Sequence, residues 1–105
     1  MGSGQEVTHQ VLSIVGHGER AGSATAVQLP TQECRVVLIK AQSGNAGNVY
    51  LGRSSAVTVA AGDTDTTTGL ELDAGQEIWM EIGNLNQVYM ICNNAGDDVT
   101  YIAFG

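Results

Sequence analysis

Residues 76–82 read Gln76-Glu77-Ile78-Trp79-Met80-Glu81-Ile82, and this short stretch decides the expected fold. Ile78, Met80 and Ile82 occupy every second position, with Trp79 and Glu81 between them. A period of two is that of a β-strand, in which successive side chains point to opposite faces. We therefore expect a strand that buries its apolar face and turns Glu77, Trp79 and Glu81 outward.

The segment from Cys34 to Gln42 is a second strand signal, because Val36-Val37-Leu38-Ile39 is apolar at four consecutive positions. A strand that is apolar on both faces is either buried on both sides or has an outer face that meets a partner. Both interpretations stay open on the sequence alone.

The rest of the chain alternates short apolar segments with glycine- and asparagine-rich turns, and it holds fourteen glycines but a single proline. The apolar residues nowhere sustain the three-and-four spacing of a helix. We therefore expect an all-β fold, a jelly-roll-like β-sandwich of about eight short antiparallel strands. The expected strands are residues 6–15, 24–29, 34–42, 49–51, 57–59, 76–82, 87–93 and 99–104.

Turn-rich segments separate these strands in our interpretation, and three of them have a defined role. Residues 16–23 are expected to form a loop because three glycines interrupt the pattern, residues 73–75 a turn, and residues 94–97 a hairpin loop. Residues 1–23 are then an N-terminal arm or first strand with a glycine-rich loop, and residues 24–105 are the sandwich core. A chain of 105 residues is expected to form one domain overall.

The composition is unusually poor in charge. Charged residues make up 14% of the chain and hydrophobic residues 43%, whereas soluble domains usually carry about 25% charged residues. A surface with so little charge is typical of a chain that is partly covered by its neighbours. We therefore expect a homo-oligomer, or a place in a larger assembly.

The net charge of −7 disfavours some partners. An acidic chain is repelled at long range by nucleic acid and by anionic membrane surfaces. No apolar run approaches the roughly 20 residues of a membrane-spanning helix, and residues 1–6 lack the basic and apolar blocks of a signal peptide. We expect a soluble protein made in the cytoplasm, with no nucleic-acid or membrane partner.

Several short phrases of the sequence carry a resemblance to a known group of proteins. They are residues 26–30 (AVQLP), 34–41 (CRVVLIKA), 47–52 (GNVYLG), 72–78 (LDAGQEI), 84–89 (NLNQVY) and 99–104 (VTYIAF). In these phrases the chain resembles small structural proteins of tailed bacteriophages and prophages, in which a β-sandwich serves as a capsid decoration (cement) protein or as part of a tail or fibre. The similarity covers about the last four fifths of the chain.

The resemblance implies a role in the virion rather than in catalysis. The implied protein binds the outer surface of a phage head, with the major capsid protein as its partner, and it stabilises the shell. It implies a small homo-oligomer, with a trimer favoured and a dimer as the alternative. The shared phrases supply no catalytic residue, so we expect no enzyme and no cofactor.

Trp79 is the residue that most invites a functional interpretation, because the alternation places it on the face opposite the apolar one. Tryptophan is enriched at interface hot spots. Two alternatives stay open, a loop of the same chain that covers the ring and a carbohydrate that stacks on Trp79 or Tyr50 in a carbohydrate-binding module. The interface residues we predict are Trp79, Val37, Ile39, Tyr89 and Tyr101.

The remaining reactive side chains form no recognisable site in the sequence. Cys34 and Cys92 lie in apolar runs, which favours buried free thiols over a bond between them. His9 and His17 are far from both cysteines in the sequence, so no metal cluster is expected. Acid and amide side chains that suit calcium in type but not in spacing are better explained as turn residues; they are Asp63, Asp65, Asn93, Asn94, Asp97 and Asp98.

Overall fold

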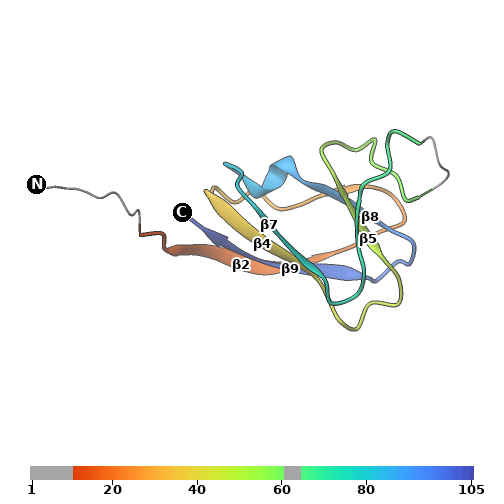
Figure 1. Ribbon diagram of the computed structural model, residues 1–105, viewed down its shortest axis with the longest axis horizontal. Coiled ribbons are helices and arrows are strands. Elements are labelled where there is room, and N and C mark those ends of the chain that lie inside the picture. Colours follow the sequence, from red (N-terminus) through yellow and green to blue (C-terminus); the bar gives the residue numbers. More distant parts are fainter. Residues whose placement is uncertain (1–10, 61–64) are drawn as a thin grey trace, which may run out of the picture.

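The computed structural model describes residues 11–60 and 65–105, and in this part of the chain eight strands form two four-stranded sheets (Figure 1). The first sheet has the order β2-β9-β4-β7 and the second the order β3-β8-β5-β6. A short 3-10 helix, η1 (Leu85–Gln87), precedes β8. The strands are β2 (Ile14–Ala21), β3 (Val27–Gln28), β4 (Val36–Ala41), β5 (Val49–Gly52), β6 (Leu70–Leu72), β7 (Glu77–Met80), β8 (Tyr89–Cys92) and β9 (Asp98–Phe104).

The strand pairing is nested along the chain. β5 pairs with β6, β4 with β7, β3 with β8, and β2 with β9, and every pair is antiparallel. Such a chain is one long two-stranded ribbon, which rolls up so that β4 also pairs with β9 and β5 with β8. Rolling an antiparallel ribbon into two sheets produces a jelly roll. The expected jelly-roll-like sandwich is therefore confirmed.

The core lies between the two sheets and follows the period of two. In β4, Val37, Ile39 and Ala41 are fully buried, whereas the intervening Val36 and Leu38 are partly exposed. The alternation expected in β7 is also present, since Ile78 and Met80 pack against the core and Trp79 is exposed. The buried cluster is made of Leu29, Cys34, Val37, Ile39, Ala41, Val49, Leu51, Leu72, Leu85, Val88, Met90, Cys92, Val99 and Ala103.

The segment expected to be a glycine-rich loop is instead most of a strand. β2 runs from Ile14 to Ala21 and pairs along its length with β9, with a β-bulge between Ile14 and Gly16. Gly18 faces the interior, where an added Cβ atom would lie 2.8 Å from the hydroxyl oxygen of Tyr101. The absence of a side chain at Gly18 leaves room for Tyr101, and the strand continues through this position. Of the strand expected over residues 6–15, residues 6–10 lie outside the described residues.

The count of eight strands was right, but one strand was misplaced. Residues 57–59 form only an isolated bridge, in which Thr58 pairs with Thr68, and the strand that pairs with β5 is β6. The turn at residues 73–75 is confirmed, with Gly75 in the left-handed region at a φ of 87°. Residues 94–97 do form a turn, but it connects two different sheets and therefore closes no hairpin.

One buried carboxylate ties two of the connecting loops together. Asp97 is 5% exposed and accepts hydrogen bonds from the backbone N–H groups of Ala46 and Gly47, both at 2.9 Å. Next to it, the side-chain amide of Asn45 exchanges two hydrogen bonds with the backbone of Asp98. The loop after β4 is thereby joined to the start of β9, and this end of the sandwich is closed by hydrogen bonds to backbone groups.

Candidate interaction surface

The outer face of the first sheet carries a continuous apolar surface. Residues that pair directly in an antiparallel ladder share a face, so the register places Trp79, Leu38, Ile102 and His17 in one row across β7, β4, β9 and β2. The neighbouring row, at the C-terminal end of β9, contains Val36, Phe104 and Ile14. We call the apolar members of these two rows the outer-face patch; they are Ile14, Val36, Leu38, Trp79, Ile102 and Phe104.

Two aromatic rings form the centre of the outer-face patch. The ring centroids of Trp79 and Phe104 lie 5.9 Å apart and the rings are stacked with an interplanar angle of 29°. Trp79 belongs to β7 and Phe104 to β9, and β4 lies between these strands, so the stacked pair spans β4. Stacking of this kind fixes the ring of Trp79 in place, yet 57% of the residue remains exposed.

The start of β2 extends the apolar surface away from the sheet. Val11 is 92% exposed and Ile14 61%, and Ile14 pairs with Phe104 in the ladder. The backbone of Ser13 exchanges two hydrogen bonds with Gly105, of 3.1 and 2.9 Å, which hold this segment beside the C-terminus (Figure 1). Ile14 thus adds an exposed apolar side chain beside Phe104, and Val11 adds another in the segment just before β2.

The other end of the same face is acidic. Glu19, Thr100, Lys40 and Glu77 form a row across the four strands, and Asp98 lies one step further along β9 on the same face. We call Glu19, Glu77 and Asp98 the acidic row. A hydrogen bond between the side chains of Asp98 and Glu19 raises the pKa of Asp98 to about 6, and partial burial and the charges of Glu19 and Asp97 add to the effect. The amide of Gln42 also donates to Glu19, at 2.6 Å.

Of the five interface residues predicted from the sequence, the structure places one in the outer-face patch. Trp79 lies there, whereas Tyr89 lies on the outer face of the second sheet, opposite Gln28 and Gly52. Val37 and Ile39 are fully buried, and this part of the prediction is wrong because β4 turns these two residues into the core. Tyr101 is partly buried, because its side chain packs against the core and over Gly18, and its interface role stays a prediction.

Five members of the outer-face patch escaped the sequence analysis as interface residues, namely Ile14, Val36, Leu38, Ile102 and Phe104. The signal was present in β4, where a strand that is apolar on both faces leaves Val36 and Leu38 for the outside. The choice of Val37 and Ile39 took the wrong alternate pair. Only the pairing register shows which pair faces the core, because a shift of one residue exchanges the two faces.

The two cysteines and His17 form no common site in the described residues. Both cysteines are free and buried; the thiol of Cys34 donates to the carbonyl of Ile82 at 3.3 Å, and burial raises the pKa of both thiols. His17 is exposed on β2, and His9 lies outside the described residues. In residues 11–60 and 65–105 no three His, Cys, Asp or Glu side chains are grouped so that they could hold a metal ion. No helix in these residues is long and apolar enough to cross a membrane.

The acid and amide residues weighed as calcium ligands make turn and loop contacts. Asp65 accepts hydrogen bonds from the hydroxyl and the backbone N–H of Thr67, at 2.7 and 2.8 Å, and also from the hydroxyl of Thr58. The contacts with Thr67 contribute most to lowering the pKa of Asp65 to about 2. Asp63 lies outside the described residues.

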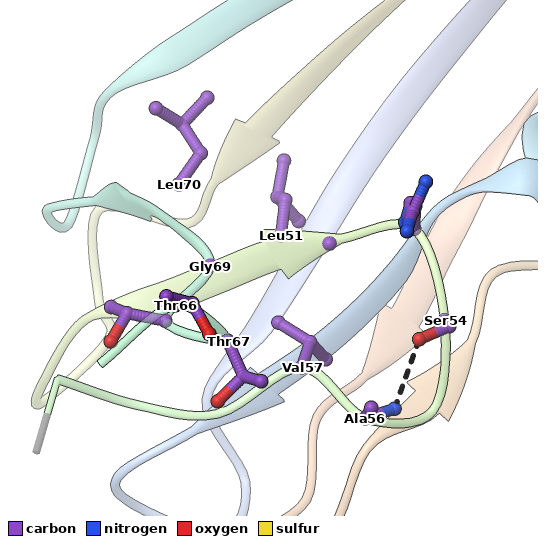
Figure 2. Close-up of a pocket in the computed structure, with 11 residues that line it drawn as sticks. Leu51, Ser54, Ala56, Val57, Thr66, Thr67, Gly69 and Leu70 are labelled. Atoms are coloured by element: carbon purple, nitrogen blue, oxygen red, sulfur yellow. Dashed lines mark hydrogen bonds between the residues drawn. The ribbon is translucent and has the colours of Figure 1, made fainter. Parts of the chain in front are cut away.

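A hollow of about 450 Å³ lies beside the second sheet, between residues 51–57, where β5 ends, and residues 66–70, which lead into β6 (Figure 2). Val57 projects between its two walls, and Ser54 accepts a hydrogen bond from the backbone N–H of Ala56 at 3.2 Å. Its lining is mostly hydroxyl and backbone groups, and Arg53 is the one ionisable side chain among the described lining residues. Tyr50, the alternative sugar platform, is 4% exposed and donates its hydroxyl to Glu71 at 3.1 Å, so its ring is not free for stacking.

Comparisons of the chain with protein-family models, with curated proteins and with solved structures find no match.

Proposed function

We propose that this protein is a viral structural protein, a capsid decoration (cement) protein that binds the outer surface of a phage head and stabilises the shell. The observation that carries the proposal is the outer-face patch. In this patch more than half of the surface of Trp79 and of Ile14 is exposed to solvent, on one face of the sandwich. An exposed apolar patch of this kind marks a site of protein association. The proposal also rests on the resemblance of the short sequence phrases to phage decoration proteins.

The mechanism is adhesive. Many copies bound to one shell act together, because attachment at one point raises the effective concentration at the next. A protein that binds the assembled shell and not its dissociated subunits stabilises the assembly by mass action. Modest affinity for each copy is sufficient for this purpose.

We propose further that the protein acts as a homo-oligomer, with a trimer favoured over a dimer. The low charge of the chain and the exposed Val11, just before β2, support contacts between copies. Sedimentation equilibrium at micromolar concentration tests this directly, and a monomer throughout the concentration range would contradict it.

The decisive experiment adds the purified protein to undecorated heads of the source phage. We expect saturable co-sedimentation with the shells, and a higher temperature of shell disruption once the sites are filled. Antibody labelling in electron micrographs then distinguishes heads from tails and fibres, the alternative location. A protein that leaves the shells unbound at micromolar concentration would refute the proposal.

A carbohydrate-binding module is the second candidate, and the exposed ring of Trp79 beside Glu77 favours it. An aromatic platform flanked by carboxylates suits the stacking and hydrogen bonding of a sugar ring. A glycan array with the isolated protein tests this role. Glycan binding that is lost in Trp79→Ser, together with no binding to heads, would replace the cement assignment.

A further inference from the structure

The face that carries the outer-face patch is asymmetric in charge as well as in polarity. Its apolar half contains Trp79 and Phe104, and its opposite half contains the three carboxylates of the acidic row and one lysine, Lys40, so that half stays acidic on balance. We infer that this face of the first sheet docks onto a protein surface that offers apolar side chains beside arginine or lysine. This inference rests on the proposed function, in which that surface is the exterior of the assembled major capsid protein.

The charges on the face favour a basic partner over a second copy of this chain. Another copy would bring the same acidic row and a further net charge of −7, and like charges brought together across an interface oppose association. Glu19 and Asp98 lie close together on this face, and the proximity of Glu19 raises the pKa of Asp98. A guanidinium or ammonium group from a partner would neutralise this pair. Complementary charge also guides the orientation of the encounter.

The side chains at the centre suit a protein partner better than a sugar. Stacking on Phe104 holds the ring of Trp79 within a row of aliphatic side chains that includes Leu38 and Ile102. A surface of this composition resembles the centre of a protein interface, in which aromatic anchors are surrounded by apolar contacts. The polar hydroxyl groups that would fix a sugar are gathered elsewhere, around the hollow near Thr66 and Thr67 (Figure 2).

The test compares affinities for undecorated shells, measured by co-sedimentation of labelled full-length protein. Trp79→Ser removes the anchor, and Leu70→Ser is its matched control because Leu70 is an apolar residue of the second sheet that is 51% exposed. We expect Trp79→Ser to weaken binding about tenfold or more, as truncation of an interface hot spot does. Leu70→Ser should bind as the wild type does.

The acidic row is tested separately by charge reversal. Glu77→Lys should weaken binding, and the affinity of this variant should depend less on salt than that of the wild type, because one attractive charge pair is lost. Glu33→Lys makes the same change of charge at an exposed position in the segment before β4, and we expect it to have little effect. Thermal unfolding followed by circular dichroism verifies that each variant is folded.

The outcomes separate the inference from the function on which it rests. If the wild type fails to bind shells, the proposed function is wrong and the docking face is withdrawn with it. If the wild type binds and folded Trp79→Ser and Glu77→Lys bind equally well, the cement function stands and the docking face is refuted. If Trp79→Ser changes the molecular mass in solution but not shell binding, the face is occupied by a second copy, which also overturns the inference.

Discussion

Replacing neighbouring residues of β4 by alanine tests the assignment of its two faces. Ile39 is fully buried in the core, with 0% of its surface exposed to solvent, and it pairs with Ile78 and Tyr101. Leu38 is partly exposed on the outer face, where it pairs with Trp79. Both substitutions remove three carbon atoms, so any difference in their effect reports the environment and not the chemistry.

The expected magnitudes follow from burial. Burying one methylene contributes about 0.8 kcal/mol, so Ile39→Ala loses about 2.4 kcal/mol of transfer free energy, and the cavity raises the total to about 3 kcal/mol. Leu38→Ala should cost about 1 kcal/mol, because part of this side chain is already in water. Both variants should still fold, since domains of this size unfold at a cost of about 5–15 kcal/mol.

Urea denaturation followed by far-ultraviolet circular dichroism measures the difference. With a slope of about 1.5–2 kcal/mol per molar urea, Ile39→Ala should lower the midpoint by roughly 1.5–2 M and Leu38→Ala by roughly 0.5 M. Equal slopes in the variants and the wild type are the control for two-state behaviour. A larger loss for Leu38→Ala than for Ile39→Ala would show that the faces of β4 are reversed, and the outer-face patch would be lost with them.

Three further predictions concern the edges of the sandwich. Gly18→Ala should destabilise the fold because the new methyl group meets the hydroxyl of Tyr101, and adding Tyr101→Phe should recover part of the loss in a double-mutant cycle of unfolding free energies. Asp97→Ala should cost about 1–3 kcal/mol in urea denaturation, because two backbone N–H groups lose their acceptor. Asp98→Asn should raise the melting temperature at pH 7.5. The raised pKa of Asp98, about 6, means that the folded state binds more protons than the unfolded state between about pH 4 and 6, so wild-type stability falls as pH rises through this window. The gain from Asp98→Asn should vanish near pH 4, and an equal gain at both pH values would show that repulsion from Glu19 is not its cause.

The fold class was predictable because the strongest sequence signals were local. The alternation around Trp79 gave the strand β7 and its correct face, and the left-handed turn at Gly75 was visible from the sequence as a turn. Those features depend on neighbouring residues only, and a period of two needs no knowledge of the partner strand.

The failures arose where distant residues decide the outcome. The glycines of β2 indicated a loop. Gly18 instead lies in a strand, where the absence of a side chain leaves room for Tyr101, a residue more than eighty positions away. The same limit affected the candidate site. The sequence showed that β4 is apolar on both faces, but only its pairing with β7 and β9 shows that Val36 and Leu38 face outward. Short-range patterns contain no information on such register.

The nested pairing of the strands has a consequence for synthesis. β9 is the last strand along the chain, yet it lies inside its sheet between β2 and β4. While the ribosome is still making residues 98–104, β2 has no neighbour and β4 has only β7, so the apolar side chains of β4 have no complete sheet to shield them. Contacts between residues far apart in sequence also form slowly. Translational pausing before β9 is therefore expected to prolong the exposure of these side chains and to reduce the yield of folded protein.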